Sequence, residues 1–106
     1  MKQRNHTIAS SRLAHLVPRF LRSVRSDVRA VDWARLDVDW CSIKDLAHRL
    51  KGSGATYGFP EITKLATQTL DAVDLRDVER VIDSLRRLEQ SVDRSLERLE
   101  VSETQP

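Results

Sequence analysis

The residues best suited to chemistry lie in one short stretch of the chain, residues 47–58. All three glycines of the protein fall in this stretch, together with His48 and, three residues later, Lys51. A neutral imidazole is a competent nucleophile toward phosphorus, and an exposed imidazole, with a pKa of about 6.5 in model peptides, is partly neutral near pH 7. The types and spacing of these residues therefore favour phosphoryl transfer through a histidine.

A helical arrangement of this stretch would expose the histidine. At about 100° per residue, residues 43–57 place their apolar side chains on one side of a helix and His48 nearly opposite. Lys51 shares the side of His48 and can offset the negative charge of a phosphoryl group. Because helical side chains lean toward the N-terminus, a side chain at position 52 would cover the turn that holds His48. Gly52 leaves that space open, whereas Gly54, on the apolar side, is expected to let a neighbouring helix approach closely.

The composition predicts a helical scaffold for this stretch. The chain has 106 residues, enough for one domain, with 32% charged and 5% aromatic side chains and few prolines and glycines. No run of apolar residues approaches the roughly 18 that a membrane span requires, and the N-terminal residues lack the apolar run of a secretory signal. The single cysteine, Cys41, cannot close an internal disulfide. We therefore expect a cytoplasmic protein.

Apolar residues recur at spacings of three and four residues in four segments. A proline, a glycine or a polar connection separates each segment from the next. These segments are residues 13–31, 43–57, 62–73 and 75–99. Pro18 is expected to end a short leading helix and to begin the main one, and Pro60 is expected to begin the third long helix. The pattern predicts an all-α protein, an antiparallel up-down four-helix bundle with a short extra N-terminal helix.

Polar residues mark the expected helix boundaries. Ser10 and Ser11 are candidate caps of the first helical turn. Ser42, followed by Asp45, resembles a capping box for the second long helix, and Asp39 is the alternative cap. Asp74 is expected to cap the last helix, with Leu75 and Val78 on its buried face, and Gly58 is expected to end the second long helix.

The domain boundaries follow from these elements. We expect residues 1–9 to be a flexible N-terminus, residues 10–100 to form the four-helix-bundle domain, and residues 101–106 to be a polar tail.

The charges are distributed unevenly along the chain. Residues 1–31 hold seven basic and one acidic side chain, although the net charge of the whole chain is only +2. Arg22, Arg25 and Arg29 fall on one helix face as a basic stripe. An alternative function is therefore a non-catalytic basic helical adaptor, which would bind an acidic protein or a nucleic acid through these arginines.

The sequence His48-Arg49-Leu50-Lys51-Gly52-Ser53, with Gly58 ten residues after the histidine, resembles the signature of histidine-containing phosphotransfer (Hpt) domains of two-component phosphorelays. The resemblance covers most of the chain. It implies that His48 is the phosphoacceptor, that Lys51 is its charge partner and that Gly52 provides steric clearance. It also implies that the phosphoryl group comes from an aspartyl phosphate on a receiver domain and passes to another receiver domain.

The resemblance further implies the partners, which are the receiver domains of a hybrid sensor kinase and of a response regulator. The Mg²⁺ that such transfers require is expected on the partner receiver domain, with no cofactor or metal bound by this chain. We expect no contact with a membrane or a nucleic acid, and a monomer. The chain has no glycine-rich nucleotide loop, so we expect no independent kinase or ATP-binding activity.

Several members of the family place a polar residue near the imidazole, twenty-two positions after the histidine. That position is Leu70 here, with Gln68 and Thr69 just before it. The sequence therefore leaves open whether any residue of the third long helix orients His48. The other histidines, His6 and His15, lack a comparable setting and are expected to be ordinary surface residues.

Overall fold

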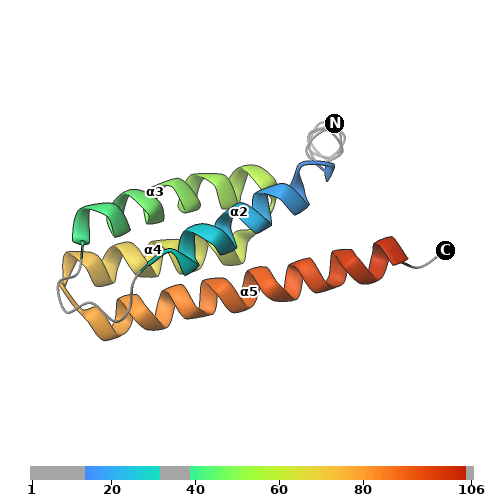
Figure 1. Cartoon of the computed structure of the whole chain (residues 1–106). Coiled ribbons are helices and arrows are strands. Elements are labelled where there is room, and N and C mark those ends of the chain that lie inside the picture. The colour runs from blue at the N-terminus through green and yellow to red at the C-terminus, as the bar shows by residue number, and fades with distance from the viewer. Residues whose placement is uncertain (1–13, 32–38, 105–106) are drawn as a thin grey trace.

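The computed structural model describes residues 14–31 and 39–104. Four helices make up nearly all of these residues: α2 (Val17–Arg29), α3 (Trp40–Tyr57), α4 (Pro60–Asp74) and α5 (Val78–Thr104) (Figure 1). The described residues contain no strand, and the all-α prediction is confirmed. The expected caps of a leading helical turn, Ser10 and Ser11, lie outside the described residues.

The helices run alternately up and down, as the short connections predict (Figure 1). Helix α3 packs against α4, α4 against α5, and α5 against α2, whereas α2 and α3 touch only slightly. The bundle is therefore open along the line between α2 and α3.

Each helix contributes one stripe of apolar side chains to a common core. The buried members include Leu21, Val24 and Val28 of α2, Ile43, Leu46 and Leu50 of α3, Ile62, Leu65 and Val73 of α4, and Val81, Leu85, Leu88 and Val92 of α5. Spacings of three and four residues place each set on one helix face, as an amphipathic helix requires. Burial of this surface is the main force that holds the helices together.

The ends of α3 follow from the local sequence. Asp39 caps its N-terminus, because its carboxylate accepts hydrogen bonds from the Ser42 N–H, at 3.1 Å, and from Ser42 Oγ, at 2.7 Å. Of the two candidate caps, Asp39 is therefore the one used. Gly58 ends the helix in the left-handed conformation, with a φ of +81°. The Phe59 N–H then donates to the Gly54 carbonyl at 2.7 Å, and the chain turns directly into Pro60 of α4.

The boundary between α4 and α5 differs from the expected one. Asp74 is the last residue of α4, so it does not cap α5. Asp77 takes that place, and its carboxylate accepts a hydrogen bond from the Arg80 N–H at 3.2 Å.

The same turn places two apolar residues outside the core. Arg76 adopts a left-handed conformation with a φ of +54°, which ends α4 without a glycine. Leu75 and Val78, expected on the buried face of the last helix, are instead 64% and 40% exposed. The expectation was wrong because Leu75 belongs to the turn that ends α4 and Val78 is only the first residue of α5.

Two of the four arginines of α2 form ion pairs with α5. Arg25 Nη1 lies 3.6 Å from Asp93 Oδ1 of α5, and Arg29 forms an ion pair with Glu89, which also belongs to α5. The hydrogen bond to Glu89 raises the pKa of Arg29 above its usual value. Arg22 is exposed, and no ion pair of the described residues involves it.

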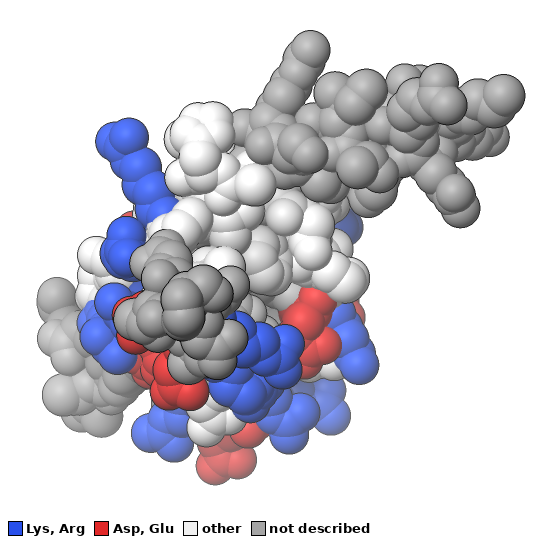
Figure 2. Space-filling model, turned by 90° about the vertical axis from the view of Figure 1, so that its right-hand side faces the viewer, with Lys and Arg blue, Asp and Glu red and all other residues white. Residues whose placement is uncertain are grey.

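Acidic and basic side chains alternate along the exposed faces of α5. They lie interspersed along the lower side of the molecule in Figure 2, the side on which α5 lies in Figure 1. Arg87 Nε, for example, lies 3.2 Å from Asp83 Oδ2. The helix itself continues through Thr104, into the residues expected to form a polar tail.

Candidate functional site

His48 lies in the middle of α3 on the outer surface of the bundle. Its side chain is exposed, while the neighbouring Ala47 and Leu50 are buried. None of the hydrogen bonds and ion pairs formed among the described residues involves the ring. Both ring nitrogens are therefore free to meet an incoming group.

The next turn of α3 leaves the approach to this ring open. A Cβ atom added to Gly52 would meet no heavy atom within 4 Å. Lys51 is exposed and follows His48 by three residues, which places it on the same side of α3. The backbone beneath is held in place, because Thr63 Oγ1 of α4 donates a hydrogen bond to the Lys51 carbonyl at 2.9 Å.

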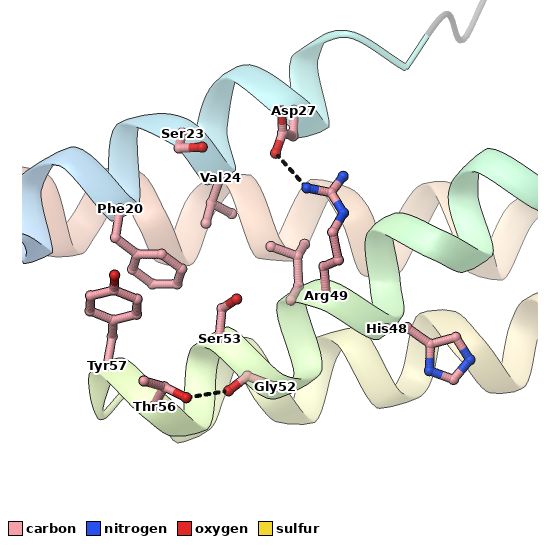
Figure 3. A pocket seen from close by; sticks show the side chains of 11 residues that line it. Phe20, Ser23, Val24, Asp27, His48, Arg49, Gly52, Ser53, Thr56 and Tyr57 are labelled. Atoms are coloured by element: carbon pink, nitrogen blue, oxygen red, sulfur yellow. Dashed lines mark hydrogen bonds and ion pairs between the residues drawn. The ribbon is translucent and has the colours of Figure 1, made fainter.

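A groove of about 450 Å³ opens beside His48, between α2 and α3. Val24 and Leu50 are among the residues that line it, and His48 and Gly52 lie at its rim (Figure 3). The His48 ring points away from α2 in this view, so the groove and the imidazole are neighbours on the surface.

The two ends of this groove differ in chemistry. At one end, Phe20 of α2 stacks on Tyr57 of α3, with ring centroids 4.3 Å apart and planes at 11°. At the other end, Arg49 reaches across from α3 toward Asp27 of α2 (Figure 3), and Arg49 Nη1 lies 3.8 Å from Asp27 Oδ2. The groove was not predicted, because it depends on how far apart two helices lie and not on the pattern of either one.

A comparison with protein-family models identifies the family of this chain. The model of the Hpt domain matches residues 15–100, which include His48, Lys51 and Gly52 and most of all four helices. The chain belongs to the Hpt domain family. Hpt domains carry out histidine phosphotransfer in two-component systems and interact with receiver domains of kinases and response regulators. Searches of curated proteins and of solved structures found no significant match.

The position that several Hpt domains fill with a polar residue is apolar here. Leu70 is half-buried in α4. Thr69 is fully buried. Its Oγ1 donates a hydrogen bond to the Leu65 carbonyl at 2.9 Å and lies 2.7 Å from Ser84 Oγ of α5. Thr69 is therefore committed to the core of this Hpt domain. Gln68 is exposed, and no side chain of α4 in the described structure forms a hydrogen bond to His48.

Two further observations on the Hpt domain concern metal sites and membrane-spanning helices. In the part of the chain that the structure describes, no three His, Cys, Asp or Glu side chains are grouped so that they could hold a metal ion. The helices within that part are also too short or too polar to cross a membrane.

Proposed function

We propose that this Hpt domain is a phosphorelay intermediate. His48 accepts a phosphoryl group from the aspartyl phosphate of one receiver domain and passes it to an aspartate of another. The observation that carries the proposal is the setting of His48, which is exposed on the middle of α3 and forms no bond to any other described side chain. An imidazole buried in the core or engaged in an ion pair could not meet a phosphoryl group held on another protein.

The transfer requires little from this chain beyond a positioned nucleophile. The unprotonated ring nitrogen of His48 attacks phosphorus, a nitrogen–phosphorus bond forms, and the bond between phosphorus and the receiver's carboxylate oxygen breaks. The attacking nitrogen carries no proton, so no base has to remove one before the attack. In the second transfer, a carboxylate oxygen of the other receiver attacks phosphorus and the imidazole leaves. Such in-line displacements depend mainly on positioning and on charge stabilisation.

Two neighbours of His48 have supporting roles in this proposal. Lys51 lies one turn along α3 and offsets the negative charge of the phosphoryl group on His48. Gly52 leaves open the space through which the receiver's phosphoryl group approaches. We further propose that the Mg²⁺ lies in the acidic site of the receiver domain and not on this chain, and that the protein acts in the cytoplasm.

The alternative of a basic adaptor has less support. Its binding surface would be the basic stripe of α2, but Arg25 and Arg29 are already paired with Glu89 and Asp93 of α5. An adaptor that used these two arginines would have to compete with Glu89 and Asp93 for them.

The proposal is tested with a panel of receiver domains that carry labelled aspartyl phosphate in the presence of Mg²⁺. We expect the wild-type protein to take up label from at least one of them and the His48→Ala variant to take up none. The matched control is His15→Ala, which removes another exposed imidazole and should be labelled like the wild type. Circular dichroism checks that both variants are helical. Full labelling of His48→Ala, or a wild-type protein that no receiver labels, would contradict the proposal.

A further inference from the structure

The stretch of α3 around His48 has a basic character. Three exposed basic side chains, Lys44, Arg49 and Lys51, lie within one turn of His48, against one exposed acidic side chain, Asp45. Neither Lys44 nor Lys51 forms an ion pair with any of the described residues. A partner that docks on His48 therefore meets unneutralised positive charge, which favours an acidic surface.

Arg49 differs from the two lysines because it has an ion-pair partner, Asp27 of α2. It follows His48 directly in the sequence, but its side chain extends over the groove toward Asp27 of α2 (Figure 3). The ion pair is weak and exposed to solvent, since Arg49 Nη1 and Asp27 Oδ2 are 3.8 Å apart and the Arg49 and Asp27 side chains are 66% and 39% exposed. Ion pairs of this kind contribute little to stability, so an incoming carboxylate can replace Asp27 at small cost.

The two ends of the groove would orient a segment of the partner protein that binds there. The Phe20–Tyr57 stack at the end away from Arg49 is an apolar surface, and Val24 lies between the stack and Arg49 (Figure 3). A partner segment that lies along the groove therefore finds apolar contacts toward Tyr57 and the Arg49 guanidinium at the other end.

We propose that Arg49 is a specificity-determining residue, which binds a carboxylate on the surface of the receiver domain that docks beside His48. Asp27 holds the guanidinium over the groove in the free protein and competes with that carboxylate. This inference rests on the proposed function of His48, and it adds the chemistry of the partner surface: an acidic side chain next to an apolar one.

The test compares four proteins with the receiver domain that labels the wild type most rapidly: wild type, Arg49→Gln, Asp27→Asn and the double variant. The initial rate of phosphoryl transfer is measured against receiver concentration. We expect Arg49→Gln to raise KM about five-fold with kcat unchanged, as for the loss of one intermolecular charge pair. Asp27→Asn should lower KM about two-fold, because the competing carboxylate is gone.

The double variant separates competition from the general effect of charge. If Asp27 acts through Arg49, then Asp27→Asn has no effect on KM once Arg49 is glutamine. The matched control is Arg98→Gln, which removes one exposed positive charge near the end of α5 and should keep the wild-type KM. A KM of Arg49→Gln equal to that of the wild type, or a full effect of Asp27→Asn in the double variant, would overturn the inference while leaving the proposed function intact.

A binding measurement makes the inference independent of the chemistry. The affinity of the same receiver is titrated against His48→Gln and His48→Gln/Arg49→Gln, neither of which is expected to accept phosphate. We expect the second variant to bind about five-fold more weakly. Equal affinities would overturn the role of Arg49 in docking.

Discussion

Gly54 of α3 lies against Thr63 of α4 so closely that a Cβ atom on Gly54 would sit 2.7 Å from Thr63 Oγ1 and 2.9 Å from Thr63 N. The same Thr63 hydroxyl donates to the Lys51 carbonyl at 2.9 Å. The turn of α3 that follows His48 is therefore fixed against α4 by a close backbone approach and a hydrogen bond. This contact confirms the expectation that a glycine on the apolar side admits a neighbouring helix.

The first prediction compares the two helical glycines. Gly54→Ala should lower the free energy of unfolding by about 1–3 kcal/mol, because the added methyl group meets backbone that cannot move away easily. Gly52→Ala should raise it by about 0.5–1 kcal/mol, since alanine is the better helix former and the space is open. Urea denaturation of both variants measures these values. A Gly54→Ala variant as stable as the wild type would show that the contact between α3 and α4 is looser than described.

The second prediction concerns access to the imidazole. Gly52→Leu should fold like the wild type, because nothing lies within 4 Å of the new Cβ, but it should transfer phosphate more slowly. The reason is that the leucine side chain would lean over the turn that holds His48. Single-turnover transfer from a phosphorylated receiver measures the rate, with Gly52→Ala as the smaller step. Transfer by Gly52→Leu at the wild-type rate would disprove the clearance role.

The third prediction concerns the charge beside His48. Lys51→Ala should lower the yield or the lifetime of phosphohistidine by about five-fold without abolishing it, since a surface contact of this kind is worth about 1 kcal/mol. Lys51→Arg keeps the charge and should retain most of the effect. The decay of labelled phosphohistidine after removal of the receiver provides the measurement. Complete loss of labelling, or no change at all, would contradict the tuning role.

The fourth prediction concerns the arginines of α2. Glu89→Gln should lower the free energy of unfolding by at most about 1 kcal/mol, because it removes a partly exposed ion pair, and the loss should shrink in high salt. The matched control is Glu97→Gln, which removes an exposed acidic side chain without an ion pair among the described residues. Neither variant should change the transfer rate. Slower transfer by Glu89→Gln alone would indicate that the face between α2 and α5 takes part in function.

Much of the bundle could be predicted from the sequence, because its signals are local. The four apolar stripes, the prolines at the first turns of α2 and α4, and the left-handed Gly58 each depend on a few neighbouring residues. The exposure of His48 follows from the same helical period. The turn between α4 and α5 was not predictable in this way, because Arg76 takes a left-handed conformation that usually indicates glycine.

The contacts between distant helices needed the structure. Nothing in the pattern of α2 shows that Arg29 meets Glu89, sixty positions away, or that Arg49 reaches Asp27 across the groove. Both pairs are determined by the packing of α2 mainly on α5, which leaves the space beside α3 open. The candidate nucleophile could therefore be found from the sequence, whereas the surface beside it could not.

The central claim is that His48 itself carries the phosphoryl group. The most direct test is to incubate the protein with a phosphorylated receiver domain and Mg²⁺ and to locate the added phosphoryl group by tandem mass spectrometry under alkaline conditions, in which phosphohistidine survives. We predict one phosphoryl group per chain, on the peptide that contains His48 and on that residue. A phosphoryl group on His6, His15 or any other residue, with His48 unmodified, would contradict the account.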